Sequence, residues 1–128
     1  MAIERIIIVV LIATSLISMT SAIPGTATFY TDYFISACYG NEDRGRMIAA
    51  ANPSLYNNGA ACGTRYRVTC TEPTNQGVPQ PCTGSEVIVT VVDLCSGCRT
   101  DQLDLSQEAF STIANTDGGR IQIEYNQV

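Results

Sequence analysis

The sequence predicts a small, closed, mostly β domain with one short helix, cross-linked by disulfides. Several segments alternate apolar and polar residues or hold β-branched runs, whereas only one segment has apolar residues at helical spacing. The chain has six cysteines, an even number. Residues 23–128 suffice for a single domain, which is marginal on hydrophobic burial alone, so cross-links are expected to stabilise it.

Residues 1–22 have the pattern of a secretory signal peptide. Arg5 gives a weakly positive start, residues 6–17 are mostly apolar, and the segment ends at the small residue Ala22. The apolar stretch is short for a membrane span, which needs about 20 residues, although a signal anchor is the alternative. We expect a mature chain that begins at Ile23, is secreted, does not associate with a membrane and is monomeric.

Strands are expected where β-branched and apolar residues alternate or accumulate, at residues 25–30, 66–71, 86–93 and 120–125. The segment 86–93 is apolar on both faces, which is typical of a central strand. Residues 47–51 form a short apolar stretch, and we expect Asn52 and Pro53 to break it.

One helix is expected at residues 106–115, where apolar side chains recur at helical spacing. Ser106 is a favourable N-cap for it. The segments 31–45 and 72–85 are polar and rich in turn residues, and residues 57–59 read Asn-Asn-Gly, a strong turn signal.

The cysteines are expected to form three disulfides, because an exported chain meets oxidising conditions. A metal site is the rival interpretation, but the chain has no histidine and lacks two paired cysteine knuckles. Cys95 and Cys98 have the spacing of a redox pair, which would need a thioredoxin-like context that the sequence does not show. Six cysteines allow fifteen pairings, and spacing alone does not choose among them. No metal or other cofactor is expected.

The charge pattern argues against nucleic-acid partners. The net charge is −5, and Lys and Arg together number only seven against twelve Asp and Glu. Without a basic patch, the chain has no means of holding a phosphate backbone. We interpret the modest acidity as a solvated surface.

Two aspartates stand at the ends of apolar runs, on either side of a tight loop with two cysteines. Asp93 follows the β-branched run 87–92, and Asp104 shortly precedes the expected helix. Both carboxylates therefore come from rigid elements and could converge on one polysaccharide groove, either catalytic or only binding. The plainer alternatives are that Asp93 is a strand-end residue bonded to the Cys95 loop and that Asp104 is a turn residue.

Six local motifs follow one another in the order of a known family, at residues 25–30, 37–40, 48–52, 57–63, 87–93 and 103–106. Together with the cysteines they resemble the first domain of expansins, whose fold is shared with family 45 endoglucanases and barwin. The resemblance is greatest to short plant proteins with an endoglucanase-45-like domain, including the plant natriuretic peptides. It implies a six-stranded double-psi β-barrel over residues 23–128, with disulfides Cys38–Cys62, Cys70–Cys82 and Cys95–Cys98.

The resemblance also assigns roles to residues of the groove. It implies that Asp104 is the essential aspartate and that Asp93 matches the aspartate ending the central strand of bacterial expansins. Thr28 and Tyr30 match the groove-lining threonine and aromatic residue of the first strand.

This chain departs from the hydrolytic pattern in two ways. Where plant expansins and the hydrolases have a His-Phe pair before the essential aspartate, it has Gln102 and Leu103. An inverting hydrolase needs a second carboxylate as base, and the candidate, Asp32, matches only loosely and is more simply a loop residue. The chain also has no tryptophan, and no second domain with a row of aromatics is expected after Val128, so tight anchoring on crystalline cellulose is not expected.

Three functions remain open. The first, which we favour, is a secreted, non-hydrolytic plant protein of the apoplast, for which the family implies a role in water and solute homeostasis through a wall polysaccharide or a cell-surface receptor. The second is an expansin-like wall loosener or glycan-modifying enzyme using Asp104 with Asp93 or Asp32. The third is a barwin-like defence or carbohydrate-binding protein.

Overall fold

The computed structural model of the protein describes residues 21–128, so the expected signal peptide lies almost wholly outside the described residues. The strands are β1 (Ile23–Tyr30), β2 (Ile48–Ala51), β3 (Arg65–Pro73), β4 (Glu86–Leu94), β5 (Gln102–Ser106) and β6 (Ile121–Gln127). The helices are α2 (Pro53–Tyr56) and α3 (Gln107–Ile113), and Asn57–Gly59 and Thr116–Gly118 form 3-10 turns.

The six strands close into a barrel in the order β1-β5-β2-β4-β3-β6. The pairs β1–β5 and β2–β4 are parallel, and the other four pairs are antiparallel. This confirms the closed, mostly β domain that the sequence predicts. The local sequence did not predict β5, whose residues read only as the approach to the helix. In the structure Leu103 and Leu105 of this strand are fully buried in the core, while Asp104 between them faces outward.

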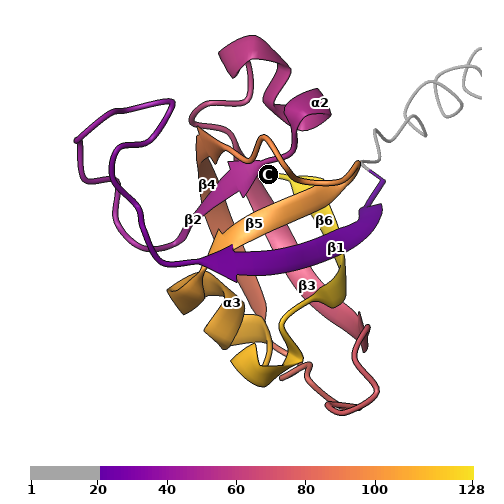
Figure 1. Cartoon of the computed structure of the whole chain (residues 1–128). Coiled ribbons are helices and arrows are strands. Elements are labelled where there is room, and N and C mark those ends of the chain that lie inside the picture. Colours follow the sequence, from indigo (N-terminus) through magenta and orange to yellow (C-terminus); the bar gives the residue numbers. More distant parts are fainter. Residues whose placement is uncertain (1–20) are drawn as a thin grey trace, which may run out of the picture.

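The core fills the inside of the barrel, and α3 closes one end of it (Figure 1). The buried side of α3 consists of Ala109, Phe110 and Ile113, and the Phe110 ring lies 4.9 Å from the ring of Phe29 in β1. Full burial of each large apolar side chain stabilises the fold by roughly 1.5–3 kcal/mol. As predicted, Ser106 caps this helix, because its Oγ accepts a 3.1 Å hydrogen bond from the Ala109 backbone N–H.

A second, four-residue helix, α2, lies at the opposite end of the barrel from α3 (Figure 1). The sequence pattern predicts that Asn52 and Pro53 break the apolar stretch at residues 47–51. In the structure they begin the helix, since Asn52 accepts a 3.0 Å hydrogen bond from Leu55 N and proline is well suited to the first helical position. Within residues 21–128 no helix is long and apolar enough to cross a membrane.

The three disulfides have the pairing that the family resemblance implies, and the described part of the chain contains no free cysteine. Cys38–Cys62 ties the long loop after β1 to the turn that follows α2. Cys70–Cys82 spans the connection between β3 and β4, and Cys95–Cys98 closes the tight turn after β4.

Candidate functional site

Adjacent strands place three of the predicted site residues in one row. Thr28 of β1 pairs with Asp104 of β5, Asp104 pairs with Ala50 of β2, and Ala50 pairs with Asp93 of β4. Residues directly opposite one another present their side chains on the same face of a sheet, here the outer face of the barrel. We call Thr28, Asp104, Ala50 and Asp93 the carboxylate row. The two aspartates are two strands apart, about 10 Å between backbones.

A β-bulge brings Asp93 into the carboxylate row. Ala49 pairs with Val91, but the next residue, Ala50, pairs with Asp93, so Val92 is the extra residue. Val91 and Val92 are consecutive and both buried, which breaks the alternation of a regular strand. In an unbroken register Val92 would lie opposite Ala50, and the row would hold a single carboxylate.

Asp104 is oriented by a chain of directed hydrogen bonds. The Arg99 backbone N–H donates to Gln102 Oε1 (2.9 Å), and Gln102 Nε2 donates to Thr28 Oγ1 (3.0 Å). Because an ionised carboxylate can only accept, the threonine hydroxyl donates its own proton to Oδ1 of Asp104, at 2.8 Å. In the sequence, Gln102 stands out only as the residue that replaces the histidine of the family pattern. Only 5% exposed, Gln102 positions the hydroxyl that holds Asp104.

The environment of Asp104 favours its protonated form. Partial burial raises the pKa of this carboxyl, against the opposing effects of the Thr28 hydrogen bond and the positive charge of Arg120. Since Oδ1 accepts from Thr28, a proton on the carboxyl resides on Oδ2. Asp104 can therefore donate a hydrogen bond at a pH where an exposed aspartate only accepts.

Tyr30 lies close to both carboxylates. Burial, followed by the negative charges of Asp93 and Asp104, raises its pKa well above the usual range. Its hydroxyl is buried and has no hydrogen-bond partner within residues 21–128. Its ring meets the ring of Tyr33 edge-on, at 5.2 Å. The hydroxyl is thus a donor held near two acceptors without being committed to either.

Asp93 also has a structural task. Its Oδ1 accepts backbone hydrogen bonds from Ala37 N at 2.8 Å and Leu94 N at 2.9 Å. The partner expected from the sequence was the Cys95 loop, but Cys95 N bonds to Ala51 O instead. Asp93 therefore anchors the long loop that follows β1 onto strand β4. This role resembles the plainer interpretation of Asp93 as a structural strand-end residue more than that of a free carboxylate.

Asp32 lies outside the carboxylate row. It is exposed in the loop two residues after β1 ends, whereas Asp93 and Asp104 come from strands. The structure brings Thr28, Tyr30, Asp93 and Asp104 together and leaves this candidate base apart.

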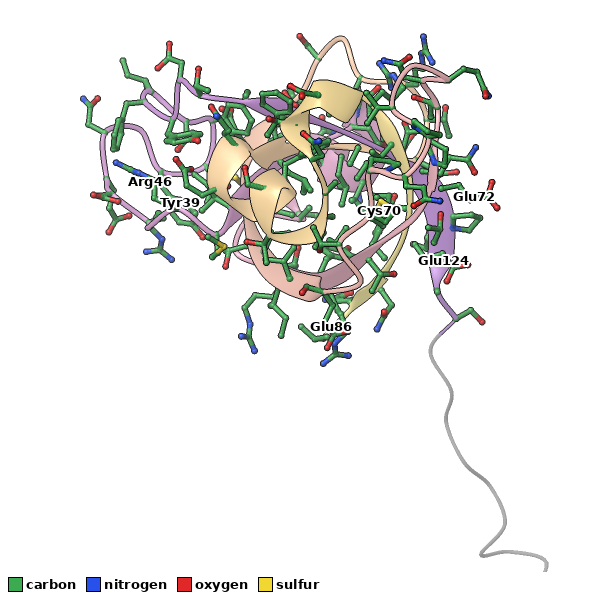
Figure 2. All side chains as sticks on the ribbon, turned by 90° about the horizontal axis from the view of Figure 1, so that it is seen from below. Tyr39, Arg46, Cys70, Glu72, Glu86 and Glu124 are labelled. Atoms are coloured by element: carbon green, nitrogen blue, oxygen red, sulfur yellow. A yellow bond between two sulfur atoms is a disulfide. The ribbon has the colours of Figure 1, made fainter. Side chains whose placement is uncertain are left out.

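The loop after β1 carries an exposed aromatic patch beside Tyr30, formed by Tyr33 and Phe34 under Arg46. The guanidinium of Arg46 lies 5.1 Å from the Tyr33 ring centre and 5.7 Å from that of Phe34, which is 43% exposed. Tyr33 anchors the loop to α3 by donating a 2.6 Å hydrogen bond to Glu108. Figure 2 shows Arg46 at one end of the molecule, with Glu72 and Glu124 at the other.

Other parts of the described chain offer less chemistry. A hollow of about 300 Å³ lies against Pro73, Pro79 and Pro81, with Glu72 as its one charged lining residue, and it holds none of the predicted site residues. No cluster of three or more His, Cys, Asp or Glu side chains suited to a metal ion occurs within residues 21–128.

Sequence comparison identifies the family. A family model described as lytic transglycolase matches residues 48–125. An EG45-like domain containing protein of Citrus jambhiri is 52% identical over 126 residues, covering 96% of this chain and 95% of that protein. The chain belongs to the EG45-like domain proteins.

Solved structures confirm the double-psi barrel of this EG45-like domain protein. The expansin of Clavibacter michiganensis is 31% identical with a TM-score of 0.67, covering 84% of this chain and 50% of the expansin. A mutant of the same expansin, solved with cellohexaose, is 32% identical with a TM-score of 0.64 over 86% of this chain and 50% of that one. A GH45 endoglucanase solved with cellobiose shares the fold at 17% identity, with a TM-score of 0.60, covering 84% of this chain and 80% of the enzyme.

Proposed function

We propose that this EG45-like domain protein is a secreted plant protein of the apoplast that binds cell-wall polysaccharide without hydrolysing it. The observation that carries the proposal is the hydrogen bond from Thr28 to Oδ1 of Asp104, which holds one carboxyl at a fixed angle on the outer barrel face. Sugar hydroxyls both donate and accept, and a protonated or ionised Asp104 can meet either need.

The surroundings of Asp104 supply the other contacts that sugars need. The half-buried ring of Tyr30 lies next to Asp104, and Tyr33 and Phe34 extend an aromatic surface beside it. Aromatic rings combine apolar contact area with a polar edge, which suits the faces of pyranose rings. The expansin that this chain resembles was solved in a mutant form with cellohexaose, which supports a β-glucan or related wall polymer as the ligand class.

Among the described residues, neither Asp93 nor Asp32 is well placed to act as the base for hydrolysis. Inversion needs an acid and a base about 6.5–9.5 Å apart, with room for a water between them. Oδ1 of Asp93 already accepts two backbone hydrogen bonds, and Asp32 is exposed outside the carboxylate row. A fixed acceptor that anchors a loop is poorly suited to activate and receive a proton from water.

One observation favours hydrolysis as a second candidate function. The raised pKa of Asp104 is the property that a general acid requires. Asp93, two strands away, would then have to act as base through Oδ2. Wall loosening of the expansin type needs no second carboxylate and remains compatible with the binding proposal. The implied role in water and solute homeostasis would be exerted from the wall space, through the polymer or a cell-surface receptor.

Titration calorimetry of the purified protein with cellohexaose and soluble β-glucan tests the proposal. Asp104→Asn and Tyr30→Ala are expected to weaken binding by about tenfold each, the size of one good polar or stacking contact. Glu124→Gln, which changes an exposed carboxylate on β6 at the opposite end of the molecule from Arg46 (Figure 2), is the control and should bind normally. Binding that is absent, or that ignores Asp104 and Tyr30 in folded variants, would refute the proposal.

A further inference from the structure

We propose that Arg99 and Arg120 form a carboxylate-binding subsite beside Asp104, so that the polysaccharide bound by this protein carries uronic acid residues. The inference rests on the proposed function, because it names the class of polymer that the same face binds. The observation behind it is a pair of arginines near Asp104 whose guanidinium groups make few hydrogen bonds within the described residues.

Arg120 stands at the end of the carboxylate row, next to Thr28. It immediately precedes β6, whose first residue, Ile121, pairs with Ala27 of β1. Continuing this antiparallel register by one residue brings Arg120 beside Thr28, on the side of β1 away from Asp104. Its Nη1 donates a 3.2 Å hydrogen bond to Thr26 Oγ1. One edge of the guanidinium is thereby held, while its remaining N–H groups are available to a ligand.

Arg99 is held over the same part of β1. Its backbone N–H and carbonyl both bond to Gln102, at 2.9 and 3.1 Å, which fixes the turn from 99 to 102. This turn presses on β1, because Thr26 N donates to Asp101 O at 3.3 Å, and a Cβ added to Gly25 would overlap that carbonyl. The turn that orients Asp104 through Gln102 thus also carries Arg99.

The two guanidinium groups are close enough to repel each other. Burial is the largest influence that lowers the pKa of Arg120, and the like charge of Arg99 is the next. The negative charge of Asp104 acts in the opposite direction. The ion pairs found within residues 21–128 use other arginines, namely Arg44, Arg46 and Arg67. Arg99 and Arg120 take part in none of these pairs, so two neighbouring guanidinium groups are left without a salt-bridge partner among the described residues, with Asp101 in the same turn as Arg99 and Asp104 acting on Arg120.

The chemistry of this site fits a carboxylate on a sugar. Guanidinium groups match carboxylate oxygens with two parallel hydrogen bonds, and such charge-assisted bonds are stronger than neutral ones. The positive pair lies at the β6 end of the row, beside Thr28, whereas Asp93 lies at its β4 end, beyond Asp104 and Ala50. An acidic sugar is therefore favoured at the arginine end of the row and neutral sugars toward Asp93.

Matched ligands that differ only in charge test the subsite. The purified protein is titrated with glucuronoxylan oligosaccharides and their carboxyl-reduced form, and with oligogalacturonate and its methyl ester, with cellohexaose as the neutral reference. We expect the acidic member of at least one pair to bind about tenfold more tightly at low salt, and the preference to shrink at high salt.

Variants assign this preference to the two arginines. The double variant Arg99→Gln/Arg120→Gln should bind the acidic and neutral members of each pair equally. Arg65→Gln removes one exposed arginine on β3 and should retain the preference. The subsite would be overturned if the unaltered protein bound both members of each pair equally, or if Arg65→Gln also lost the preference for the acidic member. The proposed function would still stand if cellohexaose bound through Asp104. Failure to bind any of these sugars would overturn both.

Discussion

Thr28 Oγ1 donates a 2.8 Å hydrogen bond to Oδ1 of Asp104 across the parallel pair of β1 and β5, between residues 76 positions apart in the chain. Gln102 donates to the same hydroxyl, and the hydroxyl in turn donates to the ionised carboxylate, which can only accept. This bond stabilises the ionised carboxylate, whereas burial favours the protonated form. The protonation of Asp104 therefore depends on the Thr28 hydroxyl, which a valine at this position would remove while keeping nearly the same side-chain shape.

Thr28→Val should raise the pKa of Asp104 further, because it removes the hydrogen bond that lowers that pKa and leaves burial unchanged. We also expect a loss of about 1 kcal/mol in the free energy of unfolding. Carboxyl-carbon NMR titration measures the pKa directly. Thr69→Val is the matched control, since its hydroxyl makes only a long, exposed 3.4 Å bond. An unchanged or lower Asp104 pKa in Thr28→Val would show that the bond does not form in solution.

Asp104→Asn should stabilise the protein near neutral pH. The pKa of Asp104 in the folded protein is raised above its ordinary value of 3.8. The protonated side chain therefore contributes to the free energy of unfolding in full below the pKa of the unfolded chain, and this contribution is lost as the pH rises through the pKa of the folded protein. An asparagine does not titrate and can still accept from Thr28. The melting temperature of the variant relative to the unaltered protein should therefore increase from pH 3 to pH 7. A difference that is constant or decreases with pH would contradict this sign, and Glu124→Gln controls for loss of an exposed charge.

Gly25→Ala should destabilise the fold by roughly 1–3 kcal/mol, as overpacking commonly does. The added Cβ would overlap the carbonyl of Asp101 and lie close to the Tyr125 ring, so the turn that carries Arg99 must shift. Gly97→Ala adds the same methyl group where nothing lies within 4 Å. Denaturant midpoints of the two variants should separate clearly, and similar midpoints would mean that the turn does not press on β1.

Removing Cys38–Cys62 should cost more stability than removing Cys95–Cys98. The first bridge joins residues 24 positions apart and the second residues only 3 apart. In the chain-entropy model these loops correspond to about 3 and about 1.5 kcal/mol. Paired Cys→Ala variants compared by denaturant midpoint check the ranking, and a reversed order would mean that native-state effects outweigh loop closure.

The sequence predicted those strands whose pattern is local. β1, β3, β4 and β6 alternate or hold β-branched runs, and each was expected near its observed position. β5 has five residues and runs directly into α3, so its two inward leucines were too few to distinguish a strand from a turn. α2 was missed because Asn52 and Pro53 can break or begin a helix, and only the bond to Leu55 decides between them.

The carboxylate row shows the same limit at the site. Asp93 and Asp104 were named from their positions beside apolar runs, and Thr28 and Tyr30 from a family resemblance. Strand pairing places all four on one face. Gln102 could not be recognised, because an amide does not titrate and its partner Thr28 lies 74 residues away. The register of β1 against β5 creates that contact, and local sequence does not encode register between distant parallel strands.

The most direct test of non-hydrolytic binding is reducing-end release from soluble β-glucan and xyloglucan, measured from pH 4 to pH 7 in the same samples that show binding. The unaltered protein is compared with Asp104→Asn, and a GH45 endoglucanase serves as the positive control. We expect the unaltered protein to bind and to release no more reducing ends than Asp104→Asn. Release that rises with time and is abolished by Asp104→Asn would contradict it and identify Asp104 as a general acid.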